Sequence, residues 1–401
     1  MNVQKRLERN IVLQYIIASL MWMRFYLPVI ALFYIASQVS VAEFAIILAV
    51  FSAVILVFEI PSGVIADFLG KRSTLLISRF LYLVELYLVA FHNGFWIFLV
   101  AKIISGIAVS LTSGTDSALL FDTLKRLGRE SEHKKISGRV YTISAISMAC
   151  MFIVGAYLFS LSPKLPAIVS IPFVGAGFIL TFFIVEPTSI VKEFTFRNSW
   201  RHFKDGLRLF WMNPYLKYLA FYSLIIGTAF EIALSLSSIY YAWVLIPVSL
   251  IGLLASIGSL FTAFASAKAH RIEERLGEFR SMILIMGVVL LGIFLLSFGV
   301  PYWGAALFML LPFIQGFYTV LLNDYTNRHV GDSHRVTMLS INNMFDNIGV
   351  ALLFPIIGAI TKAYSLRVSF IVLASIIAVY LIVLLIIFLP VIRVLHDKKR
   401  I

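Results

Sequence analysis

The sequence predicts an all-α integral membrane protein in which twelve transmembrane helices form two six-helix, pseudo-repeated bundles. Hydrophobic residues make up 61% of the 401 residues and charged residues only 13%, against about 25% charged residues in soluble proteins. The apolar residues gather in runs of roughly 20 residues, the length that a helix needs to cross a bilayer. Lys and Arg gather in alternate connectors between these runs, as the positive-inside rule requires.

The first half of the chain contains six apolar runs without the period-two alternation of strands. Because lipid admits only helices and closed barrels, these runs are expected to be helices. They cover residues 11–36, 43–66, 73–92, 95–122, 137–161 and 165–185. In the fourth run small residues recur every four positions, at Gly106, Ser110, Gly114 and Ala118, a spacing that lets helices pack closely.

The second half follows the same plan after a different connecting segment. Its apolar runs cover residues 215–240, 245–268, 280–300, 302–324, 336–361 and 367–391. In the connector, Trp200, Phe203, Leu207, Phe210 and Trp211 fall on one helical face, and Arg201, Lys204 and Arg208 on the other. This pattern predicts a helix on the inner membrane surface, with a disordered linker as the alternative. The expected organisation is an N-terminal bundle (1–186), a cytoplasmic amphipathic linker (187–213) and a C-terminal bundle (214–401).

The distribution of basic residues orients these helices. Lys164, Lys362 and Arg367 fall in outside connectors, Arg24, Arg79 and Lys102 fall within spans, and every other Lys and Arg falls on the inside if the N-terminus is cytoplasmic. This distribution predicts a multi-pass protein of a bacterial-type plasma (inner) membrane with both termini in the cytoplasm. No cleavable signal peptide is expected, because the first apolar run is too long and lacks a small-residue cleavage site.

The two halves also share short stretches of sequence. "GRVYTIS" (138–144) resembles "HRVTMLS" (334–340), and "LLFDTLKR" (119–126) resembles "LLNDYTNR" (321–328). Internal repetition is a mark of secondary transporters, whose site lies between the repeats.

The connector between the second and third spans ends the stretch "FEIPSGVIADFLGKR" (58–72). Gly63 and Asp67 share a helical face, and Gly63 would let a neighbouring helix approach. Asp67 would lie close to the start of the next helix, where partial positive charge favours a carboxylate. Gly70 would permit the tight turn between the two helices.

Lys71 and Arg72 would anchor at the lipid headgroups and pair with acids at another helix end. We therefore predict a conformational latch that holds helices together in one state. Its residues are Gly63, Asp67, Gly70, Lys71, Arg72 and, one turn earlier, Glu59.

"GVIADFLGKR" resembles the signature loop G-x-x-x-D-x-x-G-[RK]-[RK] of the major facilitator superfamily, at its expected place. "KIISG" (102–106) resembles the R-x-x-Q-G pattern of the fourth span in that superfamily, with Lys102 in place of Arg and Ser105 in place of Gln. "ERLGEFR" (274–280) is similar to a degenerate second copy of the loop, with Gly277 at the position of Gly70. The chain resembles the drug/proton antiporter branch, without that branch's Gly-Pro motif in the fifth span. The resemblance implies the major facilitator fold, in which spans one, four, seven and ten line a central cavity.

Ionisable side chains inside spans are costly and therefore candidates for function. The candidates for the substrate and proton pathway are Arg24, Lys102, Asp116, Glu231, Asp346, Asn342 and Gln315. The alternative is that such groups form structural acid–base pairs, which we favour for Glu59, Arg79 and Asp122. Glu231 or Asp116 is predicted to carry the coupling proton, because burial and a neighbouring base shift a carboxylate's pKa in opposite directions.

These features predict a secondary transporter that works by alternating access and exports small amphiphilic or drug-like molecules in exchange for protons. One alternative is proton-coupled uptake of a small charged metabolite, with Arg24 and Lys102 holding its anionic group. An alternative of another class is a non-transporting receptor or a lipid-handling protein. We expect a monomer whose partners are a small-molecule substrate, protons and lipid, with no nucleic acid, cofactor, metal site or enzymatic activity.

Overall fold

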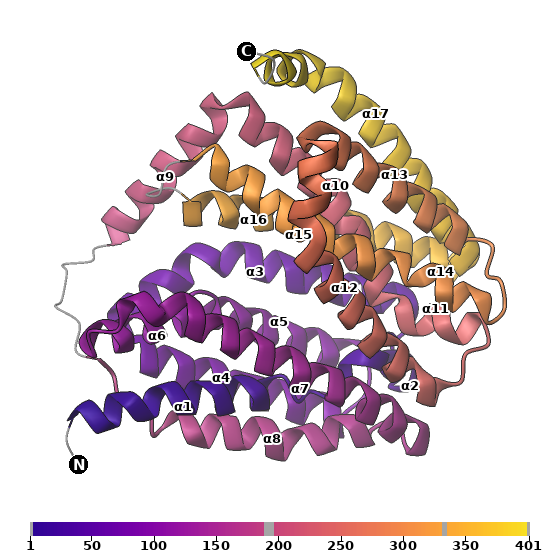
Figure 1. Cartoon of the computed structure of the whole chain (residues 1–401). Coiled ribbons are helices and arrows are strands. Elements are labelled where there is room, and N and C mark those ends of the chain that lie inside the picture. The colour runs from indigo at the N-terminus through magenta and orange to yellow at the C-terminus, as the bar shows by residue number, and fades with distance from the viewer. Residues whose placement is uncertain (1–2, 188–195, 331–334, 399–401) are drawn as a thin grey trace. The chain divides into compact units, whose positions relative to one another are not determined.

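The computed structural model describes residues 3–187, 196–330 and 335–398, in which every regular element is helical (Figure 1). The elements of the first half are α1 (Val3–Met21), η1 (Leu27–Val29), α2 (Ile30–Ala36), α3 (Val41–Leu69), α4 (Lys71–Phe91), α5 (Phe95–Thr112), α6 (Thr115–Arg126), η2 (Glu130–Glu132), α7 (His133–Leu161) and α8 (Leu165–Thr181). Those of the second half are α9 (Phe196–Met212), α10 (Pro214–Ser235), α11 (Ser237–Trp243), α12 (Val248–Leu276), α13 (Glu278–Leu296), α14 (Trp303–Phe308), α15 (Leu310–Arg328), α16 (Arg335–Ala363) and α17 (Leu366–Lys398).

Ten helical stretches in the described part of the chain are long and apolar enough to cross a membrane. The other two predicted runs do not form one continuous helix of spanning length. The first run is divided between α1 and the apolar stretch Leu27–Ala36, and the sixth is the shorter α8. The all-α membrane class is therefore confirmed, and the twelve predicted runs correspond to the ten candidate spans, one run divided between α1 and Leu27–Ala36, and the shorter α8.

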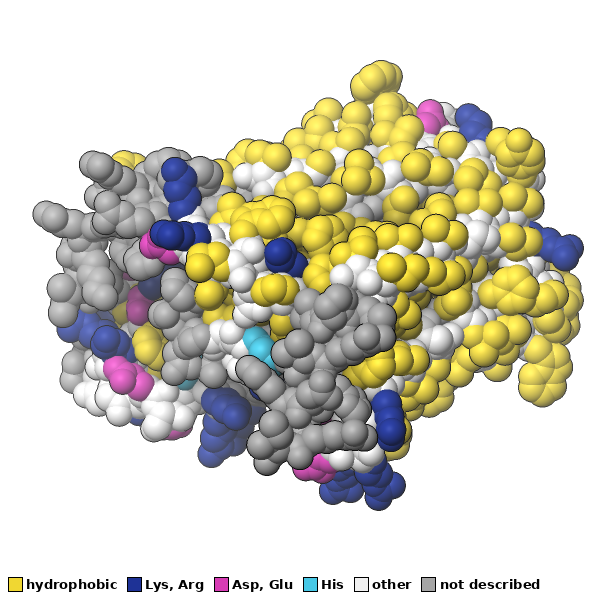
Figure 2. Space-filling model, turned by 90° about the horizontal axis from the view of Figure 1, so that it is seen from above, with side chains coloured by type: hydrophobic (Ala, Val, Ile, Leu, Met, Phe, Trp, Pro, Cys, Tyr) yellow, Lys and Arg dark blue, Asp and Glu magenta, His cyan; other side chains and the backbone are white. Residues whose placement is uncertain are grey.

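Large hydrophobic side chains are exposed along these helices, among them Phe80, Trp96 and Leu260 with exposed fractions of 53%, 73% and 65%. Figure 2 shows hydrophobic side chains over a broad area of one face, with Lys and Arg mostly toward the left and lower edges of the view. Apolar patches of this extent are unusual on soluble monomers. Lipid is the solvent in which such a surface is stable.

The chain divides into two compact units. The N-unit comprises Met1–Val39, Val50–Trp200 and Val248–Ser256, and the C-unit comprises Ser40–Ala49, Arg201–Pro247 and Ile257–Ile401. Each unit therefore takes a short segment from the other half of the sequence. The domain boundaries expected from the sequence stay a prediction.

In the N-unit, α4 packs against α5 and α8, and α1 packs against α8 (Figure 1). Leu13 and Ile17 of α1 meet Leu75 of α4 and Leu119 of α6 in one buried cluster. This cluster packs together three of the helices that surround the site described below.

In the C-unit, α10 and α16 approach each other closely because glycine replaces a side chain at two contacts. A Cβ atom on Gly349 would stand 1.9 Å from Oγ1 of Thr228, and one on Gly227 would stand 2.6 Å from the carboxyl carbon of Asp346.

Phe210 of α9 is buried against Leu216 and Ile341, whereas Trp211 is exposed. Part of the apolar face of α9 therefore covers protein, and its placement on the membrane surface stays a prediction.

The two short connectors that the sequence relates to each other have the same backbone form. Gly70, between α3 and α4, has φ +85°, and Gly277, between α12 and α13, has φ +76°. Only glycine adopts this region without strain. The turn predicted at Gly70 is confirmed, and the match at Gly277 supports the repeat.

Candidate functional site

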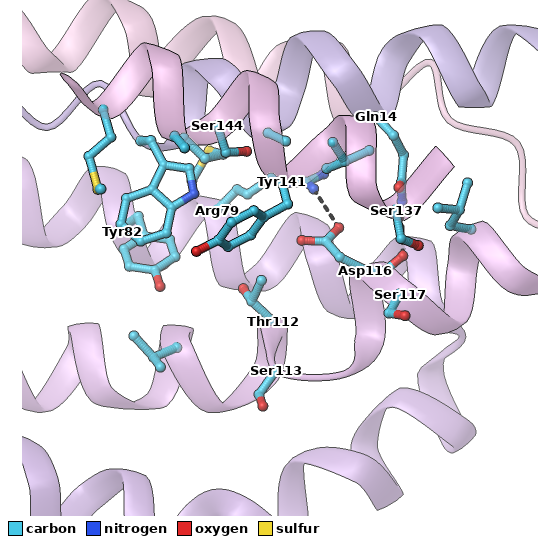
Figure 3. Close-up of a pocket in the computed structure, with 18 of the residues that line it drawn as sticks. Gln14, Arg79, Tyr82, Thr112, Ser113, Asp116, Ser117, Ser137, Tyr141 and Ser144 are labelled. Carbon is cyan, nitrogen blue, oxygen red and sulfur yellow. Dashed lines mark hydrogen bonds and ion pairs between the residues drawn. The ribbon is translucent and has the colours of Figure 1, made fainter. Parts of the chain in front are cut away.

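A cavity of about 700 Å³ lies within the N-unit, lined by α1, α4, α7 and the joint between α5 and α6. Its polar lining side chains are Gln14, Arg24, Arg79, Thr112, Ser113, Asp116, Ser117, Ser137 and Ser144. Aromatic lining comes from Trp22, Tyr82 and Tyr141. Figure 3 shows Thr112, Ser113 and Ser117 around the joint, with Arg79 reaching Asp116. Apolar walls with a few convergent polar groups are typical of small-molecule sites.

The first span is interrupted beside this cavity. Residues 22–26 lie between α1 and η1 and are not helical. The backbone N–H of Phe25 donates to Oγ of Ser170 in α8 at 2.9 Å, and that of Leu27 donates to the carbonyl of Arg24 at 3.1 Å. A Cβ on Gly155 of α7 would lie 2.0 Å from the Phe25 carbonyl oxygen. Non-helical backbone at membrane depth is tolerated where protein surrounds it, and Gly155 and Ser170 provide that surrounding here.

The fourth span is interrupted at the same cavity. Ser113 and Gly114 separate α5 from α6, and Gly114 has φ +74°. The seventh and tenth predicted spans are also divided, at Leu236 and Met309. Discontinuous helices are a common source of binding groups in secondary transporters.

The cavity wall carries one complete ion pair. Nη2 of Arg79 donates to Oδ1 of Asp116 at 2.9 Å, and Nη1 of Arg79 donates to Oγ1 of Thr181. Arg79 is buried with an exposed fraction of 4%. The structural pairing expected for Arg79 is confirmed, and its partner is one of the two acids proposed as proton carriers.

A second ion pair is buried away from the cavity lining. Lys102 of α5 approaches Oε1 of Glu85 in α4 at 3.4 Å, and the hydroxyl of Tyr26 donates to the same oxygen at 2.6 Å. Glu85 is 0% exposed and Lys102 is 4% exposed. Lys102 is therefore not among the residues that line this N-unit cavity, because Glu85 holds it between helices, and its predicted part in the substrate or proton pathway stays a prediction.

Arg24 projects from the interrupted segment into the cavity without an acidic partner among the described residues. Its guanidinium carbon lies 4.9 Å from the ring centroid of Tyr82, and its Nε is buried without a hydrogen-bond partner there. A cation over an aromatic face is stabilised by the ring quadrupole, but the N–H groups of the guanidinium plane stay available. Of the three basic residues in mid-span, Arg24 alone lines the cavity without an ion-pair partner in the described chain.

Two of the predicted latch residues, Lys71 and Arg72, contact Glu186, an acid that the sequence analysis did not single out. The carboxylate of Glu186 accepts the backbone N–H of Lys71 at 2.9 Å and that of Arg72 at 2.7 Å. Nζ of Lys71 pairs with Asp122, and the guanidinium of Arg72 donates to the Phe182 carbonyl at 2.8 Å. Pairing of Lys71 with an acid at another helix end is confirmed.

Two latch residues, Asp67 and Gly63, depart from the expectation, and a third, Glu59, is not tested. Asp67 is exposed and has no ion pair in the described chain, because Glu186 already occupies the start of α4. No described atom lies within 4 Å of a Cβ placed on Gly63, so the close helix contact predicted there is absent. Glu59 is half-buried in α3, and its role in the latch stays a prediction.

Replacing Glu186 by Gln is expected to lower the free energy of unfolding by about 1–2 kcal/mol. The variant weakens a charge-assisted cap on the first turn of α4. Thermal unfolding in detergent measures the change, with the exposed Glu130→Gln as a matched control. An unchanged midpoint in Glu186→Gln would show that the cap contributes nothing to stability.

The C-unit candidates are spread over α10, α15 and α16. The Asn342 amide donates to Oγ1 of Thr326 at 2.9 Å, so it joins α16 to α15. Asp346 lies against Gly227, one helical turn from the exposed Glu231, and Gln315 is half-buried on α15. Their predicted part in the substrate or proton pathway stays untested.

The chain matches a family model over nearly its whole length. The model of the Major Facilitator Superfamily matches residues 12–331 and 245–400. The chain belongs to the major facilitator superfamily. It is a transporter of this superfamily and not an enzyme, as the sequence predicted.

Relatives of this superfamily agree in length and fold. A Bacillus subtilis (strain 168) protein described as an uncharacterized MFS-type transporter, YxaM, is 23% identical over 358 residues, which cover 86% of this chain and 88% of that protein. The crystal structure of the nucleoside transporter NupG superposes with a TM-score of 0.79 at 15% identity, covering 97% and 99% of the two chains. That of a bacterial homologue of the human lysosomal transporter Spinster gives 0.71 at 12% identity, covering 94% and 96%. At these identities the structural likeness establishes the major facilitator fold alone.

Sequence reasoning missed the two acids that organise the N-unit. Glu85 lies within the third apolar run, and the available signal was that Lys102 in the next run needs a counter-charge. Glu186 stands at the end of the sixth apolar run, immediately before Pro187. Its position at a helix end was the available signal.

Proposed function

We propose that this protein is a secondary transporter that uses the proton gradient to move an amphiphilic organic anion by alternating access, with the N-unit cavity as its binding site. The observation that carries the proposal is the charge around the cavity. Arg79 is neutralised by Asp116, whereas Arg24 has no acidic partner in the described chain. The lining therefore has one excess positive charge.

The excess charge selects among the substrate classes. A buried cation without a partner is unfavourable in a membrane interior, and an anionic group on the solute would compensate it with charge-assisted hydrogen bonds. A cationic drug would meet repulsion from the same guanidinium. This argument favours the anionic class over drug-like cations, and it assigns the anion to Arg24 without Lys102, which Glu85 already holds.

The remaining lining supports an amphiphilic solute. Trp22, Tyr82 and Tyr141 offer flat apolar surface, and the hydroxyl groups of Ser113 and Ser117 offer neutral hydrogen bonds. A neutral ring solute such as a nucleoside is the second candidate. These hydroxyl groups and the similarity to the NupG fold favour it.

Proteoliposomes test this proposal with naphthalenesulfonate, a ring anion that stays charged at all working pH values and crosses lipid poorly. We expect an imposed pH gradient to drive its movement across the membrane faster than in protein-free vesicles. The neutral naphthalenesulfonamide and the cationic naphthylmethylammonium should stabilise the purified protein against heat less than the sulfonate does. A flux equal to that of empty vesicles, or stronger stabilisation by the cation, would contradict the proposal, and preferential binding of uridine would favour the nucleoside alternative.

A further inference from the structure

The interrupted first span joins two charged sites that the proposed function treats separately. Arg24, which lines the cavity, and Tyr26, whose hydroxyl donates to Glu85, are two residues apart in the same non-helical segment. Phe25, between them, is held through its N–H by Ser170 and through its carbonyl by close contact with Gly155. A shift of Arg24 toward a bound solute therefore acts on a short backbone that also positions Tyr26.

The buried carboxylate of Glu85 has one oxygen that accepts no hydrogen bond from the described residues. Oε1 of Glu85 accepts from Tyr26 and faces Lys102, whereas Oε2 is buried without a hydrogen-bond partner among the described residues. A buried polar atom without a partner is rare and calls for an explanation. A proton arriving from the cavity would bind at Oε2 without breaking the Tyr26 hydrogen bond.

Charged and titratable groups face Glu85 from several elements. Lys102 comes from α5, Arg24 and Tyr26 from the interrupted segment, and Tyr34 from α2. Tyr82 shares α4 with Glu85, as does Arg79, which is paired with Asp116 of α6. α8 has no charged residue, and α3 contributes the ring of Phe51 beside Lys102.

We propose that Glu85, held by Tyr26 and Lys102, is the proton site of this transporter, and that proton and anion bind to the N-unit together and not in competition. The inference rests on the proposed function, and it specifies the sense of the coupling. With Glu85 ionised, Arg24, Lys102 and Glu85 carry a net charge of one positive unit. Protonation of Glu85 raises this charge, which favours an anion at Arg24.

The coupling is reciprocal, because an anion at Arg24 must favour the proton by the same factor. Joint binding is the thermodynamic condition for movement in the same direction, so an inward proton gradient would drive uptake of the anion. The uptake alternative is therefore favoured over the export expected from the sequence. Neither Asp116 nor Glu231 is required as the proton carrier in this scheme.

Proton uptake by the purified protein tests the inference directly. Naphthalenesulfonate is added in weakly buffered solution, and a pH indicator records protons taken up per anion bound. Because the sulfonate does not titrate, the protons must go to the protein. We expect uptake approaching one proton per anion, and affinity for the anion weakening by about 5- to 150-fold as pH rises through the titration, the usual range for two coupled sites.

Variants assign the proton to its residue. Glu85→Gln should bind the anion with pH-independent affinity and no proton uptake. The double variant Glu85→Gln with Lys102→Met should give the same result, and it leaves no unpaired buried lysine. Tyr26→Phe removes the hydrogen bond to Oε1 and leaves the carboxyl group in place, so proton uptake should persist. The exposed Glu130→Gln should behave as the unmodified protein.

Two results would overturn this inference and leave the proposed function intact. The first is anion binding without proton uptake, or with proton release, in the unmodified protein. The second is undiminished uptake in Glu85→Gln. Failure of the unmodified protein to bind the sulfonate in preference to the sulfonamide would instead overturn the proposed function, and this inference with it.

Discussion

Replacing Lys102 by Met is expected to destabilise the protein by about 3–5 kcal/mol at neutral pH and above, because it leaves the carboxylate of Glu85 buried without its cation. The loss should shrink as pH falls. Protonation of the carboxylate would remove the unpaired charge, so the destabilisation is expected to be smaller in acidic solution. Thermal unfolding midpoints in detergent across a pH series measure this dependence.

The double variant Lys102→Met with Glu85→Gln provides the control for this prediction. Removing both charges leaves no unpaired ion, and replacement of a whole buried pair is often neutral. We expect most of the lost stability to return, with little dependence on pH. Equal destabilisation in the single and double variants would show that packing of the lysine stem, and not its charge, accounts for the effect.

Replacing Arg24 by Gln is expected to weaken binding of naphthalenesulfonate by roughly 10- to 150-fold, as follows from losing a charged hydrogen-bond partner worth about 1.5–3 kcal/mol. The affinity of Arg24→Lys for the sulfonate should lie between those of the unmodified protein and Arg24→Gln, because the ammonium retains the charge and lacks the planar guanidinium fork. Calorimetric titration of the purified variants measures the affinities.

The stability of Arg24→Gln separates this prediction from a structural role. Arg24 has no acidic partner among the described residues, so its removal leaves no orphaned charge, and the thermal midpoint should change little. Unchanged affinity for the sulfonate in a folded Arg24→Gln protein would contradict the assignment of Arg24 as the anion-binding residue.

The fold class was accessible from the sequence because lipid imposes strict rules. Apolar runs of membrane-spanning length and the positions of Lys and Arg indicated the helices, and the stretch "GVIADFLGKR" indicated the turn at Gly70. The same rules could not place the break at residues 22–26. Apart from Arg24 its composition is as apolar as that of its flanks, and the conformation depends on Ser170 and Gly155 from distant helices.

The candidate site was only partly predictable for a related reason. Mid-span charges indicated Arg24, Lys102 and Asp116, but sequence spacing does not reveal which acid faces which base across helices. Lys102 pairs with Glu85, and Asp116 pairs with Arg79. The part that Arg24, Lys102 and Asp116 play in the substrate or proton pathway stays a prediction.

A structure of the protein with naphthalenesulfonate bound tests the central claim most directly. The account predicts the ring in the N-unit cavity beside Tyr82 and Tyr141, with sulfonate oxygens within hydrogen-bonding distance of the Arg24 guanidinium. A ligand bound outside this cavity, or one whose sulfonate points away from Arg24, would contradict it.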